Sequence, residues 1–306
     1  MKVLITGGAG YVGTPLAKSL LECGHEVTIL DNFMYGYESI LHLISHENLS
    51  VIKTDIRNED LSYLKGQDVI FHLAAISGYP ACEANPSSAE FINYVATRRI
   101  SDYLSKSQIL IFASSTSLYG SSGTLSNENS KVEPVSLYGV TKIKSEQHIM
   151  QRENSISLRW ATVFGVSSRM REGLIVNDFV DKAIKEGTLV LYSGDSKRTF
   201  MHINDSVQGY IFALYNTEEM LGGVFNMGNE SLNFSKREIA EKIHEYYSDF
   251  EIIDSSMEDK DVRHFLVDFS KARKLGYECN YTLDDGILEL IKLYKFYDPN
   301  SFIRPI

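Results

Sequence analysis

The sequence predicts an α/β protein built on a doubly wound parallel sheet, with a smaller, interleaved C-terminal lobe. Short apolar or β-branched runs alternate with segments long enough for crossover helices, a pattern typical of parallel strands buried on both faces. A glycine-rich turn follows the first of these runs. The predicted strands are 2–6, 26–30, 49–53, 68–74, 108–114 and 155–161, and the predicted crossover helices include 13–23, 87–106 and 138–152.

The regular alternation ends near residue 162, which indicates a second lobe. Residues 1–165 are predicted to form the doubly wound domain, with returning segments near 194–224, and residues 166–306 mainly the second lobe. The boundary is soft because no Pro/Gly-rich linker separates the two parts. In the second lobe we expect helices near 173–186, 204–216 and 283–297, and a strand near 188–192.

The composition excludes several classes of protein. A chain of 306 residues with 43% hydrophobic content can bury one large core or two modest ones. A net charge of −10 without a long basic run argues against a nucleic acid as the main partner. Three widely spaced cysteines indicate neither a disulfide framework nor a metal site. Without a signal-peptide pattern or an apolar stretch approaching ~18 residues, we expect a cytoplasmic protein with no membrane partner.

The glycine-rich turn predicts a dinucleotide site. In "TGGAGYVG", Gly7, Gly10 and Gly13 lie where missing Cβ atoms allow a tight turn and the approach of a pyrophosphate to the helix N-terminus. The second strand ends at Asp31, whose carboxylate can accept hydrogen bonds from an adenosine ribose and would repel a 2′-phosphate. A structural turn followed by an ordinary aspartate is the alternative. The order of the elements favours a cofactor site, for NAD over NADP.

Two copies of Leu-Tyr-Gly lie within residues 114–142, and only the second is followed by a lysine at helical spacing. Tyr138 and Lys142 are four residues apart, so their side chains share one helix face. A free tyrosine has a pKa of about 10, but a nearby lysine and an oxidised nicotinamide favour the phenolate. Tyr138 is therefore a candidate general base. Tyr119, in the first copy, has no lysine partner and is expected to pack in a loop.

With these motifs in order, the chain resembles an extended short-chain dehydrogenase/reductase of the nucleotide-sugar epimerase/dehydratase family, over nearly its whole length. The resemblance implies a Rossmann-type domain and a homodimer or larger homo-oligomer formed through the helices at 87–106 and 138–152. We expect Ile100, Leu104 and Ile149 to face outward there. The matching segments are "TGGAGYVG", Asp31-Asn32, Asp55-Ile56, "HLAA" (72–75), "NYVAT" (93–97), "SSTSLYG", "YGVTK", "RTFMHIND" (198–205), "FNMGN" (225–229) and "SKARKLGY" (270–277).

The resemblance also implies a catalytic set. Tyr138 would take the proton of a sugar 4-hydroxyl while the hydride passes to NAD, and a 4-keto sugar forms. Lys142 would support the phenolate, and Ser115 would hydrogen-bond the reacting oxygen. The implied cofactor-binding residues are Gly7, Gly10, Tyr11, Val12, Gly13, Asp31, Asn32, Asp55, Ile56, Leu73, Ala74, Ala75, Asn93, Tyr138 and Lys142.

Substrate contacts implied by the family are Asn177, Arg198 and Arg263, with Arg198 meeting the diphosphate of a nucleotide sugar. Arg169 or Arg171 would contact the sugar or base, although a solvated charged loop explains them equally well. Thr162 and the acidic pair Glu258-Asp259 depart from the pattern of 4-epimerases that act on UDP-galactose. The nucleotide base and the sugar stay open.

Thr116 and Ser117 occupy the positions where the family's dehydratases and decarboxylases carry an acid or a base. This leaves a 4-epimerase or a one-way C4 dehydrogenase or reductase, acting in the biosynthesis of surface-polysaccharide sugars. A non-catalytic NAD-binding regulator would be expected to lose Tyr138 or Lys142. An NADP-dependent reductase of a hydrophobic carbonyl compound would want a basic residue near Asp31. His72 and His202 are expected to be packed, hydrogen-bonded histidines.

Overall fold

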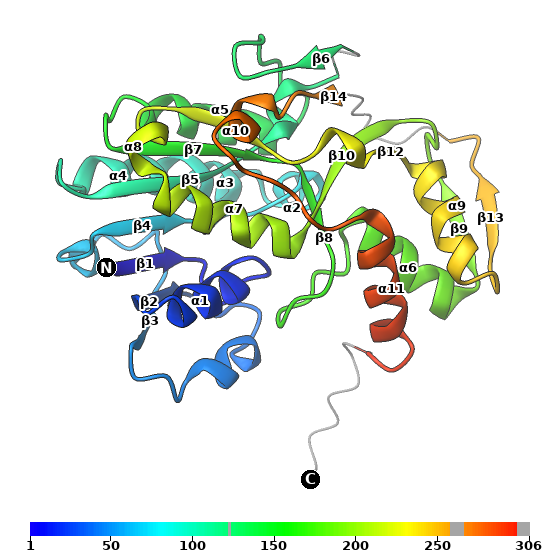
Figure 1. Ribbon diagram of the computed structural model, residues 1–306, viewed down its shortest axis with the longest axis horizontal. Coiled ribbons are helices and arrows are strands. Elements are labelled where there is room, and N and C mark those ends of the chain that lie inside the picture. The colour runs from blue at the N-terminus through cyan, green and yellow to red at the C-terminus, as the bar shows by residue number, and fades with distance from the viewer. Residues whose placement is uncertain (122–123, 258–265, 299–306) are drawn as a thin grey trace.

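A seven-stranded parallel sheet forms the centre of the larger domain, as the sequence predicts (Figure 1). The computed structural model describes residues 1–121, 124–257 and 266–298. The strand order is β11-β7-β5-β4-β1-β2-β3. All six predicted strands are present, and β11 joins them from the C-terminal half of the chain. The bounds are β1 (Lys2–Thr6), β2 (Glu26–Asp31), β3 (Leu49–Lys53), β4 (Val69–His72), β5 (Ile109–Ser115), β7 (Ser155–Trp160) and β11 (Val224–Met227).

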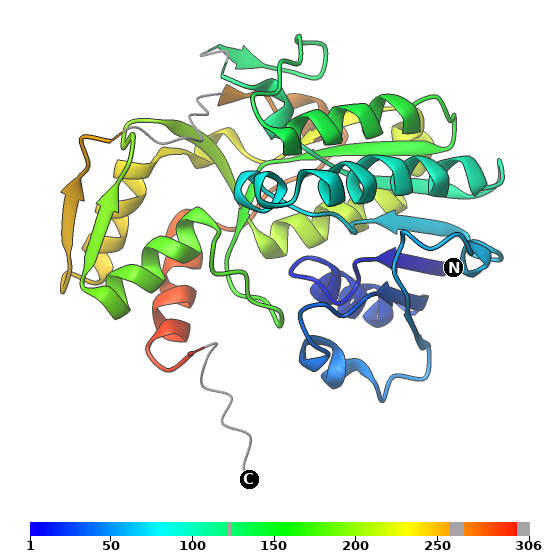
Figure 2. The ribbon, with the colours of Figure 1, turned by 180° about the vertical axis from the view of Figure 1, so that it is seen from behind.

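Helices cover both faces of this sheet. On one face lie α1 (Gly13–Glu22) and α7 (Ile203–Tyr215), and on the other lie α4 (Thr97–Tyr103) and α5 (Leu137–Ile149) (Figures 1 and 2). Successive side chains of a strand point to opposite faces, so each strand contributes to both apolar layers. Val3 and Ile5 of β1 accordingly join the layer beneath α1 and α7, whereas Leu4 joins the layer beneath α4 and α5.

The expectation that Ile100, Leu104 and Ile149 face outward is wrong. They are 0%, 5% and 0% exposed and lie in the apolar layer between the sheet and helices α4 and α5. Apolar side chains of a helix that covers a sheet turn toward that sheet, because burial there removes the most apolar surface from water. Phe91, which is 39% exposed, lies in η3 (Phe91–Ala96), directly before α4.

The smaller lobe has its own apolar core, built on two small sheets. The three-stranded sheet has the order β12-β10-β8, and β13 pairs with β9. The helices α6, α9 and α11 enclose this core (Figure 1). The bounds are β8 (Thr162–Phe164), β9 (Thr188–Leu191), β10 (Lys197–His202), β12 (Asn233–Ser235), β13 (Glu251–Asp254), α6 (Ile175–Glu186), α9 (Lys236–Tyr246) and α11 (Leu283–Tyr294).

Short elements complete the described chain. One parallel pair, β6 with β14, joins the polar loop 120–136 to the C-terminal part of the chain. Within the described ranges, no helix is long and apolar enough to cross a membrane. The remaining bounds are η1 (Glu38–Leu43), η2 (Ser62–Leu64), α2 (Tyr79–Ala84), α3 (Pro86–Glu90), the π-helix η3 (Phe91–Ala96), η4 (Thr116–Tyr119), β6 (Leu125–Ser126), α8 (Thr217–Met220), η5 (Glu230–Leu232), β14 (Leu266–Val267) and α10 (Ser270–Lys274).

The parallel arrangement fixes the position of the site. Carboxyl ends of parallel strands meet at one edge of the sheet, and ligands of doubly wound folds bind there. The glycine turn follows β1, Asp31 ends β2, and Ser115 ends β5. The sequence motifs therefore converge on this edge although they are far apart along the chain.

Candidate functional site

The turn after β1 is shaped for close approach of a ligand to the backbone. Gly7 adopts a φ of 71°, which disfavours residues with a Cβ atom. A Cβ atom at Gly13 would lie 2.2 Å from the carbonyl oxygen of Gly7, so the turn closes only without it. The Gly10 amide donates to that same carbonyl at 3.1 Å, and α1 begins directly afterwards. This cradle at a helix N-terminus fits the pyrophosphate of NAD.

Asp31 borders the same turn. One carboxylate oxygen accepts a hydrogen bond from the Ala9 amide at 3.1 Å, and the other accepts one from the Phe33 amide at 2.8 Å. Phe33 has a positive φ of 57°, which turns the chain sharply after β2. The carboxylate is thereby fixed at the end of β2, where a ribose would lie in a dinucleotide site.

Asn32 and Asp55 lie beside each other at the ends of neighbouring strands. The Asn32 side-chain amide donates to Asp55 at 3.2 Å, and Arg57 makes an ion pair with the same carboxylate at 2.8 Å. Hydrogen bonds from Arg57 lower the pKa of Asp55 to about 2. The other predicted cofactor residues, Tyr11, Val12, Ile56, Leu73, Ala74 and Ala75, are buried or half-buried in the segments after β1, β3 and β4.

Helix α5 carries Tyr138 and Lys142 and begins with a side-chain cap. The Ser136 hydroxyl accepts a hydrogen bond from the Gly139 amide at 3.2 Å. Lys142 is 3% exposed, and its ammonium group donates to the carbonyl of Ala113 at 2.6 Å and lies 5.9 Å from the centre of the Tyr138 ring. Burial lowers the pKa of Lys142, and the negative charge of an ionised Tyr138 opposes this shift. The structure therefore brings the predicted pair together at the end of β5.

Ser115 ends β5 and caps the turn η4. Its hydroxyl oxygen accepts a hydrogen bond from the Ser117 amide at 3.2 Å. A Cβ atom at Gly139 would lie 3.2 Å from the carbonyl oxygen of Ser117, so η4 packs against the first turn of α5. The Thr116 hydroxyl points away into the sheet, where it donates to the carbonyl of Trp160 at 3.0 Å. Ser115 thus lies on the same edge as Tyr138.

Asn93 lies in the π-helix η3, a rare form that is frequent at functional sites. Its side chain bonds the amide and the carbonyl of Ile76 at 2.8 and 2.9 Å, and donates to Thr141 of α5 at 3.1 Å. Asn93 therefore joins the segment after β4 to the helix that carries Tyr138. These contacts are structural, and its contact with a cofactor stays a prediction.

A segment after β8, residues 166–172, reaches the larger domain; we name it the strap (Figures 1 and 2). Its Ser167 hydroxyl donates to the carbonyl of Tyr11 at 2.6 Å, and the Tyr11 hydroxyl donates to the carbonyl of Gly165 at 2.8 Å. The guanidinium group of Arg169 lies 4.1 Å from the centre of the Tyr35 ring.

Arg171 makes a further contact between the strap and the larger domain. It donates to the carbonyl of Ser77, after β4, at 2.6 Å. The strap thus contacts the segments after β1, β2 and β4, whereas the predicted cofactor residues Asp55 and Ile56 lie after β3.

The predicted substrate residues lie in three different settings. Asn177 is buried at the start of α6, where its amide bonds the backbone of Gly165 and Arg171 and so orders the base of the strap. Arg198 is buried in β10 of the smaller lobe. Arg263 lies outside the described residues. Contacts of these residues with a diphosphate remain predictions.

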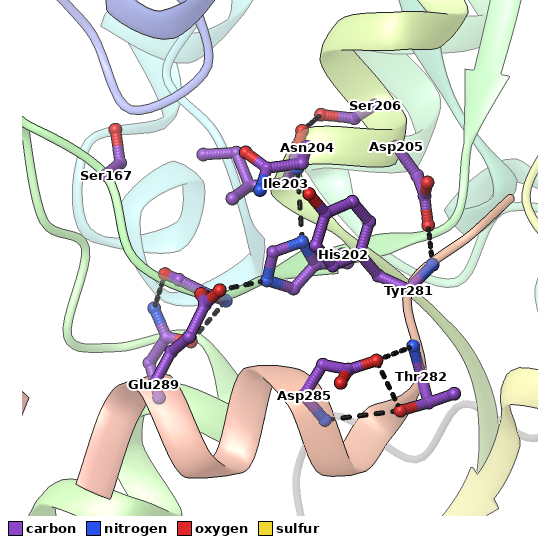
Figure 3. Close-up of polar contacts among 12 residues, drawn as sticks. Ser167, His202, Ile203, Asn204, Asp205, Ser206, Tyr281, Thr282, Asp285 and Glu289 are labelled. Atoms are coloured by element: carbon purple, nitrogen blue, oxygen red, sulfur yellow. Dashed lines mark hydrogen bonds and ion pairs between the residues drawn. The ribbon is translucent and has the colours of Figure 1, made fainter. Parts of the chain in front are cut away.

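The two histidines that the sequence singled out are packed and hydrogen-bonded, as predicted. His72 lies between the hydroxyls of Thr6 and Thr97, and burial lowers its pKa to about 3. His202 contacts Glu289 at 3.2 Å, and its ring stacks on Tyr281 (Figure 3). Both fix the packing of neighbouring elements. In the ranges that the structure describes, no group of His, Cys, Asp and Glu side chains could hold a metal ion.

Sequence reasoning missed the role of Tyr119. Its hydroxyl donates to the side-chain oxygen of Asn226 at 2.7 Å and accepts from Arg159 at 2.8 Å. Burial raises the pKa of Tyr119 to about 12, so it stays protonated near neutral pH. Tyr119 lies in η4 and not in a loop, and its hydroxyl bonds both of these partners. No local pattern revealed its partners, which come from two other strands.

The shape of the glycine turn makes a testable prediction about cofactor binding. Gly13→Ala should abolish most NAD binding, because the new Cβ atom meets the Gly7 carbonyl and opens the turn. Gly173→Ala is a matched control, since nothing lies within 4 Å of a Cβ atom at that glycine. Calorimetric titration with NAD, with melting temperatures of both variants, measures the effect. Wild-type affinity in Gly13→Ala would refute the assignment of the turn.

Comparison with known proteins agrees with this geometry. Residues 3–228 match the sequence model of the NAD dependent epimerase/dehydratase family. The chain is 32% identical over 247 residues to the uncharacterized UDP-glucose epimerase YtcB of Bacillus subtilis, covering 74% of this chain and 77% of that protein. It is 28% identical to UDP-glucuronic acid decarboxylase 1 of Danio rerio, covering 96% and 72% of the two chains.

A solved structure is also similar over almost the full length. UDP-glucuronic acid 4-epimerase from Bacillus cereus, in complex with UDP-glucuronic acid and NAD, superposes with a TM-score of 0.87 at 25% identity, covering 96% of this chain and 99% of that one. The family match, the Rossmann sheet and the glycine cradle identify NAD as the cofactor. The chain therefore belongs to the NAD dependent epimerase/dehydratase family and is an enzyme of the short-chain dehydrogenase/reductase type.

Proposed function

We propose that this protein is a 4-epimerase of a nucleoside-diphosphate sugar, acting in the biosynthesis of surface-polysaccharide sugars. The observation that carries the proposal is the placement of Tyr138, Lys142 and Ser115 on one edge, next to a turn that carries hydroxyls and no acid or base. Tyr138, Lys142 and Ser115 can support oxidation and reduction at a carbon that carries a hydroxyl. These three residues offer no further acid or base for dehydration or decarboxylation.

The chain's own groups supply the proton chemistry. Tyr138 accepts the proton of the sugar 4-hydroxyl, and the Lys142 ammonium group stabilises the phenolate across the helix face. Lys142 itself is held by the carbonyl of Ala113, so its charge is fixed in position. Ser115 presents a hydroxyl to the reacting oxygen. NAD held in the cradle of Gly7, Gly10 and Gly13 would supply a hydride acceptor and donor at C4, so that the hydride could return to the other face of the turned 4-keto sugar.

Thr116 and Ser117 favour epimerisation over the other reactions of the family. A hydroxyl with a pKa far above neutrality cannot shuttle a proton as a carboxylate does. The Thr116 hydroxyl is moreover committed to the carbonyl of Trp160. We therefore do not propose decarboxylation for this chain, although a decarboxylase is among its relatives.

The substrate class rests on the relatives and on the predicted arginines. The names of the relatives and of the solved 4-epimerase all carry UDP, which supports a UDP-sugar. Arg198 and Arg263 are proposed to meet the diphosphate, and Asn177 to lie near it. Arg169, which stacks on Tyr35, is proposed to contact the sugar or the base.

The strap supports retention of the cofactor between turnovers. We infer that a dinucleotide bound beside the glycine turn lies under the strap, so that its release would break the contacts of Arg169 with Tyr35 and of Arg171 with Ser77. An epimerase returns its own hydride and needs no exchange of cofactor, whereas a one-way dehydrogenase must exchange it every cycle. The strap therefore favours the epimerase.

We also propose that two copies associate through the outer faces of α4 and α5. Phe91, at the start of η3, is 39% exposed on this side of the molecule. A hydrogen bond between His148 and Asp102 and an ion pair between Lys144 and Glu90 order the surface around it. A partner helix pair would cover the exposed ring.

The activity is tested with a panel of UDP-, GDP-, dTDP- and CDP-sugars, with product configuration and NADH followed together. We expect one UDP-sugar to give its 4-epimer with no net NADH. Tyr138→Phe should bind NAD and lose at least about a hundredfold in turnover. Tyr103→Phe should match the wild type, because Tyr103 is 40% exposed at the end of α4.

Two outcomes of this panel would contradict the proposal. Accumulation of NADH with a 4-keto product would indicate a one-way dehydrogenase. Full activity of Tyr138→Phe would remove Tyr138 from the mechanism.

The strap predicts slow release of NAD. Replacing both arginines, in Arg169→Gln with Arg171→Gln, should speed release about tenfold, since a cation–π contact and a charged hydrogen bond are lost. The measurement follows protein-bound NAD after dilution into an excess of labelled NAD. Ser168→Ala, at an exposed strap position, is the control. An unchanged release rate in the double variant would argue against the strap's role.

The association predicts a mass in solution of twice 34.6 kDa or a larger multiple. Light scattering coupled to size-exclusion chromatography measures this mass. Phe91→Glu should shift the protein toward the monomer, because it would bury a charge in the interface. A wild-type monomer at every concentration would contradict the proposed dimer.

A further inference from the structure

Helix α5 is held on the sheet by polar bonds along its inner face. Its buried residues include Thr141, Lys142, Ser145 and Glu146, so this face has no continuous apolar stripe. An apolar stripe fixes a helix by area and tolerates small rotations, whereas hydrogen bonds and ion pairs fix direction. The position of Tyr138 therefore depends on these polar partners.

The strongest of these partners is Arg159 of β7. Its guanidinium group makes an ion pair with Glu146 at 2.6 Å, with both side chains almost fully buried. Ser157 donates to the second carboxylate oxygen of Glu146 at 2.8 Å. Glu146 follows Lys142 by four residues and Tyr138 by eight, so the three share one helix face. A rotation that loosens Glu146 would also move Lys142 and Tyr138.

Tyr119 fixes Arg159 from the other side. Its hydroxyl accepts a hydrogen bond from the guanidinium group, which also lies 5.2 Å from the centre of the Tyr119 ring. The same hydroxyl donates to Asn226 of β11. Tyr119 is 1% exposed and stands at the end of η4, the turn that begins after Ser115. One phenol thus lies between the Ser115 turn and the ion pair of the catalytic helix.

Asn226 extends the connection to the pair β6 and β14. Its amide group donates to the carbonyl of Asp268 at 3.0 Å, and its backbone amide donates to Glu128 at 2.8 Å. Asp268 follows β14 and donates from its backbone to Ser126 of β6 at 2.8 Å. The connection therefore runs from α5 through Arg159, Tyr119 and Asn226 to the loop 120–136.

We propose that Tyr119 is a positioning residue of the reaction, whose phenol holds Arg159 and Glu146 so that Lys142 stays beside Tyr138. It touches neither the substrate nor the cofactor in this role. The inference rests on the proposed function in taking Tyr138 as the base. It also explains why the first Leu-Tyr-Gly copy carries a tyrosine although no lysine follows it.

The test is Tyr119→Phe, which keeps the ring on Arg159 and removes both hydrogen bonds of the hydroxyl. With Arg159 less firmly held, the charge of Lys142 supports the Tyr138 phenolate less well. We expect the pH–rate profile of epimerisation to move about one pH unit upward, with about a tenfold loss of kcat at pH 7. The KM for the nucleotide sugar should stay unchanged, because its binding groups are untouched.

A second readout needs no sugar. The absorbance at 295 nm, which reports ionised tyrosine, is followed as the pH of the NAD-bound protein is raised. Four proteins are compared: the wild type, Tyr138→Phe, Tyr119→Phe and the double variant. The difference isolates ionisation of Tyr138, which should move to higher pH in the Tyr119→Phe background. A protein that shows this shift but turns over no sugar would refute the proposed function and leave the positioning role standing.

Tyr277→Phe is the matched control. The Tyr277 hydroxyl is equally buried and donates to the carbonyl of Asp205 at 2.9 Å, away from α5. Tyr277→Phe should lower the melting temperature without moving the pH–rate profile or the absorbance titration. An equal shift in Tyr277→Phe, or no shift in Tyr119→Phe, would overturn the proposal.

Should Tyr119→Phe fail to fold, Ser157→Ala decides the question. It removes one hydrogen bond to Glu146 and leaves the ion pair in place. The proposal predicts a smaller shift in the same direction, and an unchanged profile would contradict it.

Discussion

The buried contact between Glu146 and Arg159 holds the proposed catalytic helix against the sheet. Breaking a buried ion pair by removing one partner typically costs about 3–5 kcal/mol, because the other charge is left without compensation. This contact ties α5 to β7, whose neighbour β5 supplies both the Ala113 carbonyl for Lys142 and the hydroxyl of Ser115. The candidate site therefore depends on a helix that directional hydrogen bonds and an ion pair hold in place, more than the burial of apolar area does.

Much of the fold and the outline of the site could be predicted from local sequence patterns. The six apolar runs gave the strands of the parallel sheet, because each run reports burial on both faces by itself. Tyr138 and Lys142 were visible because helical spacing is local. The inward turn of Ile100, Leu104 and Ile149 was mispredicted, because the resemblance suggested an interface at these helices while these three side chains pack against the sheet.

Other features could not be predicted because their partners are distant in sequence. The Tyr119 hydroxyl meets Arg159 and Asn226 only when η4, β7 and β11 are assembled. Likewise, Arg169 and Tyr35 come together only when the smaller lobe packs on the larger one. The sequence showed an arginine-bearing loop but carried no pattern that pointed to its aromatic partner.

The proposed chemistry is a cycle in which the proton and the hydride both return to the sugar. The ammonium group of Lys142 is buried behind Tyr138 and donates to a backbone carbonyl, which favours return of the proton to the substrate oxygen. The strap contacts the segments after β1, β2 and β4 beside the proposed cofactor site, which favours return of the hydride. Both features suit a reaction that leaves its cofactor unchanged.

The most direct test of this account uses a nucleotide sugar that carries deuterium at C4. If the protein is a 4-epimerase with a retained cofactor, the epimerised product keeps the deuterium at C4, because the same hydride is taken and returned. Appearance of the deuterium in free NADH, or its loss to solvent, would contradict the closed cycle.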